Sequence, residues 1–243
     1  MEEDISKIVN VENLPEHIAI IMDGNRRWAK KNNLTTPQGH KEGAENLKRI
    51  SKYANKIGIK YMTVYAFSTE NWKRSKEEVA AIMKLLKFYI FDFFKSDDNN
   101  IKVKVIGRTE DLPKDLYEEI KKVEEKTKNN TGMILNIAFN YGGRDELVTA
   151  TKKIAQKVAS GELNIEDINE NLISDNLYTA GQPDPDLMIR TSGEERISNF
   201  LPWQISYSEF VFTEKYWPEY SEKDLLESIQ IYQKRTRRFG GNK

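Results

Sequence analysis

Short apolar runs alternate with amphipathic segments along the whole chain. Runs of four to eight mostly apolar residues predict strands that are buried on both faces, as is typical of parallel sheets. Such runs occur at Ile18–Met22, Tyr61–Phe67, Ile101–Ile106, Met133–Asn140, Leu187–Arg190 and Glu209–Phe212.

The segments between these runs carry apolar residues at helical spacing. They predict helices that start at Arg27, cover Leu47–Ile57 and Val79–Phe94, and run from Pro113 to about Lys128, from Gly143 to near Ser160 and from Glu222 to about Arg238. Because strands and helices alternate, we expect an α/β fold with a mostly parallel central sheet of about six strands, flanked by helices on both sides. No linker or repeat divides the chain, so a single domain over residues 1–243 is predicted.

The amino-acid composition excludes some classes of binding partner and of catalytic chemistry. Lys plus Arg and Asp plus Glu each number 38, so the chain has no overall basic field and a nucleic-acid partner is not expected. The absence of cysteine excludes disulfides, thiolate catalysis and cysteine-ligated zinc. The acidic N-terminus lacks the apolar segment of a signal peptide, and the apolar window Leu85–Phe94 is too short to span a bilayer. A soluble, cytoplasmic protein is predicted.

Polar clusters follow three of the predicted strands. Asp23-Gly24-Asn25 follows the first, Ser68–Arg74 the second and Arg190–Asn199 the fifth. Open α/β sheets bind ligands at the carboxyl ends of their strands, so these clusters are candidates for one site. Taken singly, each is equally consistent with a helix cap or a solvated loop.

Five arginines come from these clusters: Arg26, Arg27, Arg74, Arg190 and Arg196. Guanidinium groups suit phosphate oxygens, and the N–H groups at the start of the first helix favour an anion. The five arginines together predict a site for more than one phosphate group.

A metal and a hydrocarbon are also predicted at this site. Asp23 and Glu209 could hold a hard divalent cation through carboxylate oxygens. Trp28, Phe67 and Trp72 could supply apolar walls. The predicted ligand therefore carries a diphosphate at one end and a hydrocarbon at the other.

Longer stretches of the chain resemble the cis-prenyltransferases, the undecaprenyl diphosphate synthase family, over nearly the whole length. The resemblance rests on HIAIIMDGNRRWAKK, GHKEGAENLKRI, YAFSTENWKR, LNIAFNYGGR, IRTSGEERISNFLPWQISYSEFVFT and RRFGG. It implies a Mg²⁺-dependent homodimer that adds isopentenyl diphosphate to an allylic diphosphate, such as farnesyl diphosphate, with Z geometry. The product would be a long-chain polyprenyl diphosphate, the precursor of the lipid carrier for cell-wall synthesis.

The resemblance also implies roles for individual residues. It makes Asp23 the essential aspartate, Asn71 the proton acceptor, and Asp23 and Glu209 the metal ligands. An uncharged amide is a poor base, so a diphosphate oxygen is the alternative acceptor. The implied substrate-binding residues are Gly24, Asn25, Arg26, Arg27, Trp28, His40, Ser68, Thr69, Glu70, Trp72, Arg74, Arg190, Arg196, Ile197 and Ser198.

The chain departs from the family pattern at a few positions. Thr36 stands where many members have an arginine that contacts phosphate, and Arg26 stands where many have glycine. Glu195 stands where some members have a histidine that can assist the metal. Near the terminus, Arg238-Phe239-Gly240 fits a family pattern that reaches the partner subunit's site.

Two alternatives remain to be weighed, and a third is rejected. The aromatic-rich helix Val79–Phe94 is either the wall of an apolar product tunnel or an ordinary core helix. The chain could be a non-catalytic diphosphate- or isoprenoid-binding subunit of the same fold, although it keeps the full set of site residues. A phosphatase of the haloacid-dehalogenase type is rejected, because Ile21 stands where its nucleophilic acid is needed. Release of so apolar a product predicts a peripheral membrane contact.

Overall fold

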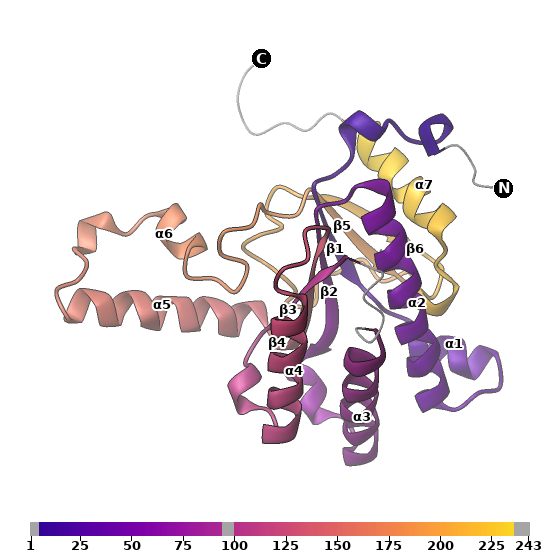
Figure 1. Cartoon of the computed structure of the whole chain (residues 1–243), viewed down its shortest axis with the longest axis horizontal. Coiled ribbons are helices and arrows are strands. Elements are labelled where there is room, and N and C mark those ends of the chain that lie inside the picture. Colours follow the sequence, from indigo (N-terminus) through magenta and orange to yellow (C-terminus); the bar gives the residue numbers. More distant parts are fainter. Residues whose placement is uncertain (1–4, 94–99, 236–243) are drawn as a thin grey trace.

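A parallel sheet forms the centre of the molecule (Figure 1). The computed structural model describes residues 5–93 and 100–235, with side chains for residues 6–85 and 100–235. The strands are β1 (His17–Ile21), β2 (Tyr61–Ser68), β3 (Lys102–Ile106), β4 (Ile134–Tyr141), β5 (Leu187–Thr191) and β6 (Glu209–Thr213). They lie in the order β3-β4-β2-β1-β5-β6, and every neighbouring pair is parallel. Each predicted strand is confirmed to within one residue at either end.

Helices flank this sheet. They are α1 (Asn25–Lys31), α2 (Thr36–Ile57), α3 (Lys76–Phe93), α4 (Lys114–Thr127), α5 (Gly143–Ala159), α6 (Glu170–Ser174) and α7 (Glu222–Gln233). The prediction that the last helix runs to Arg238 is wrong, because α7 ends at Gln233. Beyond it the Arg235 side chain turns to β6 and donates to the Phe210 carbonyl oxygen at 2.8 Å.

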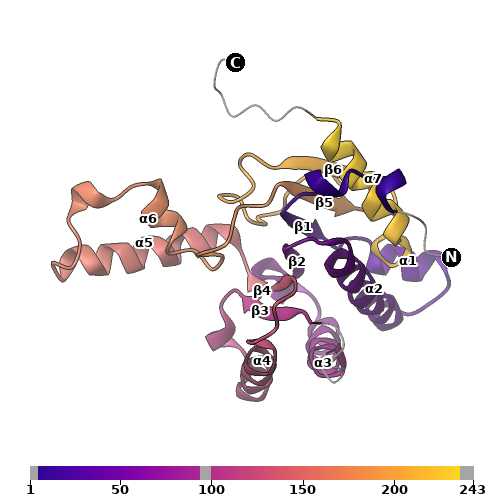
Figure 2. The same ribbon diagram turned by 45° about the horizontal axis from the view of Figure 1, so that its top comes forward.

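The two faces of the sheet are covered differently (Figure 2). On one face, residues of α2, α4 and α7 pack with the strands into the larger core, and Val79, Ile82 and Met83 of α3 join it at the margin. On the other face the cover comes largely from the segment after β5, including Phe200 and Leu201. Helices α5 and α6 extend from the body as an arm, so the predicted second helical layer is only partly formed (Figure 1).

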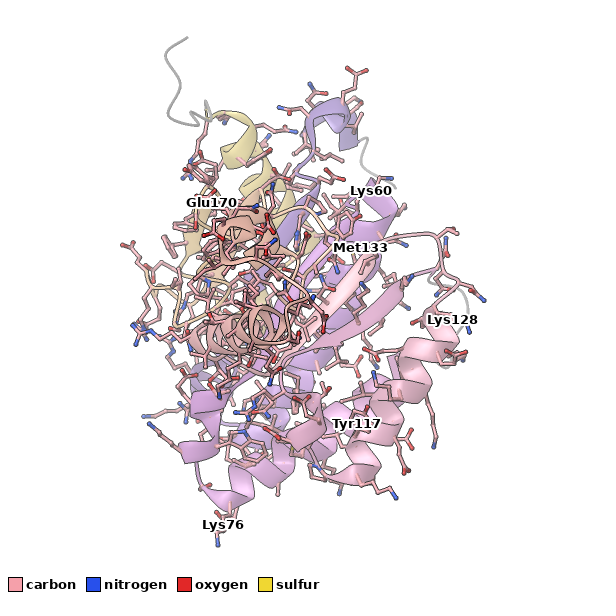
Figure 3. All side chains as sticks on the ribbon, turned by 90° about the vertical axis from the view of Figure 1, so that its left-hand side faces the viewer. Lys60, Lys76, Tyr117, Lys128, Met133 and Glu170 are labelled. Carbon is pink, nitrogen blue, oxygen red and sulfur yellow. The ribbon has the colours of Figure 1, made fainter. Side chains whose placement is uncertain are left out.

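The parallel register gives the sheet two distinct edges. His17, Tyr61 and Ile134 are aligned at the amino ends of β1, β2 and β4. Figure 3 shows the same polarity: Lys60 and Met133, just before β2 and β4, lie in the upper half of the view, and Lys76 at the start of α3 lies at the bottom. The segments that leave the carboxyl ends of β1, β2 and β5 therefore meet at one edge.

Candidate active site

A pocket of about 850 Å³ lies at the carboxyl edge of the sheet. Its lining comes from the segments that follow β1, β2 and β5, together with residues of α2 and α3. All five candidate arginines lie against it. The predicted site residues in its lining are Asp23, Gly24, Asn25, Arg26, Arg27, His40, Ser68, Glu70, Asn71, Arg74, Arg190, Arg196 and Ser198.

Asp23 lies between two guanidinium groups. Its Oδ2 atom is 2.8 Å from Nη2 of Arg190 and 3.4 Å from Nη2 of Arg27, and its Oδ1 accepts the Gly24 N–H at 2.7 Å. Burial alone raises the pKa of the Asp23 carboxyl. The hydrogen bond and charge of Arg190, with the charge of Arg27, outweigh this and hold the pKa below its ordinary value. Asp23 is therefore an anion at neutral pH.

Gly24 allows the chain to turn from β1 into α1. It has a φ of +104°, a conformation that side chains rarely adopt. A Cβ atom there would lie 2.8 Å from Cδ1 of Tyr216 and 2.9 Å from Oγ of Ser192. Glycine at position 24 is thus favoured both by backbone conformation and by close packing.

The segment after β5 accepts hydrogen bonds from Arg190 of β5 and from Arg27 of α1. The Arg190 side chain is only 5% exposed, and it donates to the Arg196 carbonyl oxygen and to Oγ of Ser198 at 2.8 Å. Arg27 Nη1 lies 3.1 Å from both the Ser192 carbonyl oxygen and Oε1 of Glu194. Glu194 also pairs with Arg196. These contacts hold the guanidinium groups in place within the pocket.

Glu78 of α3 organises a second cationic group and was not predicted from the sequence. Its Oε1 is 2.9 Å from Nη1 of Arg74 and 3.7 Å from Nε2 of His40, and its Oε2 is 3.6 Å from Nη1 of Arg26. Burial, with the charges of Arg74 and Arg26, lowers the pKa of His40 despite the opposing effect of Glu78. The available signal was the spacing of Arg74 and Glu78, four residues apart at the start of a helix.

Asn71 lies in the short 3₁₀ turn η3 (Thr69–Lys73) that follows β2 and lines the pocket. Its Oδ1 accepts the Ser68 N–H at 3.1 Å, so the side chain caps the turn. This contact fixes the amide and confers no basicity on it.

Five predicted site residues do not line the pocket: Trp28, Thr69, Trp72, Ile197 and Glu209. Trp72 is 43% exposed, packs edge-on against Phe67 and donates from Nε1 to Oδ1 of Asn140 at 2.7 Å. The variant positions Thr36 and Glu195 are also absent from the lining.

Within a single chain the structure does not bring together Asp23 and Glu209, the two predicted metal ligands. Glu209 is the first residue of β6 and aligns with Leu187 at the amino ends of their strands, whereas Asp23 follows the carboxyl end of β1. Its carboxylate instead pairs with Arg235, 2.9 Å between Oε2 and Nη1.

The pocket also has an apolar side. The residues that form it are Ile21, Met22, Tyr65, Ala66, Phe67 and Ile82. Ile82 comes from the helix predicted as a tunnel wall, and Phe94 of that prediction lies outside the described residues. Ile21, Met22, Tyr65 and Ala66 were not predicted as site residues, although each lies near a strand end that carries a predicted one. A polar and an apolar side in one pocket suit a ligand with a charged head and a hydrocarbon tail.

The residues present fit a cation that binds largely through its substrate. In residues 6–85 and 100–235 no three His, Asp or Glu side chains are grouped as a metal cage. Mg²⁺ commonly uses one or two carboxylates and completes its shell with water and phosphate oxygens. Asp23, anionic and in the pocket lining, is a suitable carboxylate.

Two further predictions concern the rest of the chain. Arg238, predicted to reach a partner's site, lies outside the described residues. Among the helices that the structure describes, none is both long and apolar enough to cross a bilayer.

Comparison with known proteins gives consistent matches. The sequence model described as "Putative undecaprenyl diphosphate synthase" matches residues 21–240. The chain is 50% identical over 234 residues to "Ditrans,polycis-undecaprenyl-diphosphate synthase ((2E,6E)-farnesyl-diphosphate specific)" of Micrococcus luteus, covering 96% of this chain and 94% of that protein. It is 51% identical to an isoprenyl transferase of Clostridium tetani, covering 96% of this chain and 92% of that one.

Solved structures agree with these matches. Lavandulyl diphosphate synthase from Lavandula x intermedia, in complex with dimethylallyl diphosphate, is 39% identical with a TM-score of 0.91, over 94% of this chain and 99% of that one. A probable undecaprenyl diphosphate synthase from Campylobacter jejuni is 32% identical with a TM-score of 0.78, over 94% of this chain and all of that one.

Proposed function

Because the chain belongs to the undecaprenyl diphosphate synthase family, we propose that it condenses isopentenyl diphosphate onto an allylic diphosphate with Z geometry, giving a long-chain polyprenyl diphosphate. The observation that carries this proposal is the pocket itself. Five arginines and the anionic Asp23 line it together with an apolar side. One cis-prenyltransferase domain over residues 1–243 would account for the whole chain.

The two diphosphates are assigned to different arginines of the pocket. The allylic diphosphate binds the N–H groups of the first turn of α1, with Arg26, Arg27 and Arg74 around it. The isopentenyl diphosphate binds Arg190, Arg196 and Ser198 on the segment after β5. These assignments rest on convergence in one pocket and on the resemblance of the motifs.

The reaction breaks the allylic C–O bond, and the diphosphate leaves with the electron pair. The isopentenyl double bond forms the new C–C bond, and a proton is then lost. The arginines stabilise the negative charge on the leaving group, a contribution that is large when donors are already in position. Mg²⁺, bound through Asp23 and diphosphate oxygens, would further stabilise that charge.

We assign the proton to a diphosphate oxygen rather than to Asn71. The Asn71 Oδ1 already accepts the Ser68 N–H, and a neutral amide is a weak base. Asn71 then shapes the turn beside the reacting carbons.

The apolar side of the pocket would hold the growing hydrocarbon. Ile82 of α3 is part of the pocket lining, and we assign it to the wall beside that hydrocarbon. Each added isoprene unit increases the tendency of the product to enter lipid. We therefore propose a cytoplasmic enzyme that contacts the membrane peripherally when product is released.

A homodimer is proposed from the exposed apolar residues of the arm and of the sheet edge. Val148 is 52% exposed on α5, Ile165 is 64% exposed beyond it, and Tyr207 is 68% exposed just before the edge strand β6. Exposed apolar side chains on a projecting arm and beside an edge strand favour burial against a second copy.

Incubation with farnesyl diphosphate, labelled isopentenyl diphosphate and Mg²⁺ tests the proposed function. The label should enter butanol-extractable products containing several added units with Z double bonds, and a chelator should abolish incorporation. Absence of any extended product would contradict the proposal.

A further inference from the structure

Asn199 joins three segments that come from different strands. Its Nδ2 donates to Oε1 of Glu70 at 3.0 Å, and its Oδ1 accepts the Arg144 N–H at 2.9 Å. Its carbonyl oxygen accepts the Gly143 N–H at 2.8 Å. One residue therefore connects the turn after β2, the start of α5 after β4, and the loop after β5.

The backbone around this junction is built for close approach. Asn199 has a φ of +65°, and asparagine tolerates this left-handed conformation better than most residues. A Cβ on Gly142 would lie 2.6 Å from Oγ1 of Thr69 and 3.0 Å from Nδ2 of Asn199. The two loops can therefore close over the end of β4 only because glycine is there.

The junction spans the pocket. Asn199 follows Ser198, whose hydroxyl accepts from Arg190, and Glu70 precedes Asn71. Glu70, Asn71, Ser198 and Asn199 all line the pocket. The hydrogen bond between Asn199 and Glu70 thus links the turn after β2 directly to the loop after β5.

We propose that Asn199 is a positioning residue that acts through Glu70. It holds the loop carrying Arg196 and Ser198 at a fixed distance from the turn carrying Asn71. This inference rests on the proposed function, in which isopentenyl diphosphate binds that loop and reacts beside that turn. Small displacements of bound reactants are costly to the rate of a condensation, because the two carbons must meet in a narrow range of geometry.

The test is Asn199→Asp in two backgrounds, Glu70 and Glu70→Gln. Aspartate keeps an oxygen for the Arg144 N–H and tolerates the left-handed backbone, but it sets a carboxylate against Glu70. A glutamine at position 70 restores a donor–acceptor pair in the reverse direction. In the Glu70 background, we expect Asn199→Asp to lower kcat/KM for isopentenyl diphosphate about tenfold or more relative to wild type. In the Glu70→Gln background, the same substitution should lower kcat/KM less than twofold relative to Glu70→Gln alone.

A second variant, Asn199→Gly, keeps the inference testable if the aspartate variant does not fold. Asn199→Gly keeps the backbone conformation and removes both side-chain contacts, so its loss should be the same in both backgrounds. Asn130→Asp is the matched control: Asn130 Nδ2 donates to the Ile101 carbonyl oxygen at 2.8 Å, at the amino edge of the sheet. It should lower Tm without raising KM for isopentenyl diphosphate.

Equal losses for Asn199→Asp in the two backgrounds would overturn the inference, as would losses that follow Tm alone across the variants. If wild-type protein incorporates no isopentenyl diphosphate, the proposed function fails instead, and the two failures are thus distinguished.

Discussion

At the scale of single residues, each cation of the pocket is held by an acid or a carbonyl oxygen. Asp23 holds Arg27 and Arg190, Glu194 holds Arg27 and Arg196, and Glu78 holds Arg26 and Arg74. The guanidinium groups are therefore oriented before any diphosphate arrives. Such preorganisation lowers the cost of reorganisation when negative charge develops on the leaving group.

Glu78→Gln tests this arrangement. The amide oxygen can still accept from Arg74, but the charge facing Arg26 and His40 is lost. We expect kcat/KM for the allylic diphosphate to fall about tenfold, equivalent to about 1.4 kcal/mol, as steady-state kinetics would show. The neighbouring Glu77→Gln, at an exposed position, is the control and should remain within twofold of wild type. Similar effects of the two substitutions would contradict the role given to Glu78.

Gly24→Ala tests the turn that places Asp23. The left-handed backbone costs about 1–3 kcal/mol for a residue with a side chain, and contact with Tyr216 and Ser192 adds to this. Gly181→Ala also places a side chain on a positive-φ backbone (φ +76°), but in open space, with no atom within 4 Å of the added Cβ. Chemical denaturation should show a larger loss of unfolding free energy for Gly24→Ala, with activity lost as well. Equal losses would show that close packing at Gly24 is unimportant.

The sequence predicted some residues of this site better than others, for physical reasons. Asp23 and the arginines were predicted because they follow or end apolar strands, and α/β sheets bind ligands at the carboxyl ends of their strands. Glu209 begins its predicted strand, so the same rule places it at the opposite edge of the sheet from Asp23 within one chain. Glu78 was missed because two of its partners, Arg26 and His40, come from other helices and meet it only in the folded chain.

At the scale of elements, apolar runs were the most reliable signal. Every strand was predicted to within a residue because each is a short apolar run, and β1, β4 and β5 are buried almost throughout. The first three turns of α2 were not predicted, because Gly39 and Gly43 interrupt its apolar spacing. A Cβ at either glycine would lie 2.3 Å from an oxygen atom of Asn25, so these glycines allow α1 to pack on α2. This packing is a tertiary contact between two helices, so the local pattern of apolar residues could not predict it.

Helix α3 carries the prediction on product length. Ile82 lines the pocket, so Ile82→Ala should lengthen or broaden the product distribution and Ile82→Trp should shorten it. The alanine change should also cost about 2 kcal/mol of stability, near the lower end for large-to-small substitutions because the side chain is only partly buried. Chromatography of the dephosphorylated products gives the distribution. A less stable enzyme with unchanged products would identify α3 as core alone.

At the scale of the whole molecule, strand order explains why the site is where it is. The sheet grows from β1 to β2, β4 and β3 on one side, and to β5 and β6 on the other. The connections on the two sides of β1 diverge at its carboxyl end, which is where α/β sheets open a crevice. The sequence predicted the edge but not this order, since order depends on pairings between distant strands.

The proposed dimer is tested by the size of the particle in solution. Val148→Asp places a charge on the arm, and Val11→Asp places one at a similarly exposed valine beside Asn10, whose N–H is bonded to Gln233 of α7. Sedimentation velocity should show a dimer for wild type and Val11→Asp, and a shift toward monomer for Val148→Asp. A wild-type monomer at micromolar concentration, or dissociation by both variants alike, would contradict the assignment.

The central claim is that Asp23, held between Arg190 and Arg27, acts on a diphosphate as the allylic bond breaks. The most direct measurement is kcat of Asp23→Ala in the labelled isopentenyl assay, with calorimetric binding of farnesyl diphosphate measured in parallel. We predict that kcat falls by about a thousandfold or more while the affinity for farnesyl diphosphate changes by less than about tenfold, because the carboxylate acts chiefly in the transition state. A kcat close to that of wild type would contradict this account of the site.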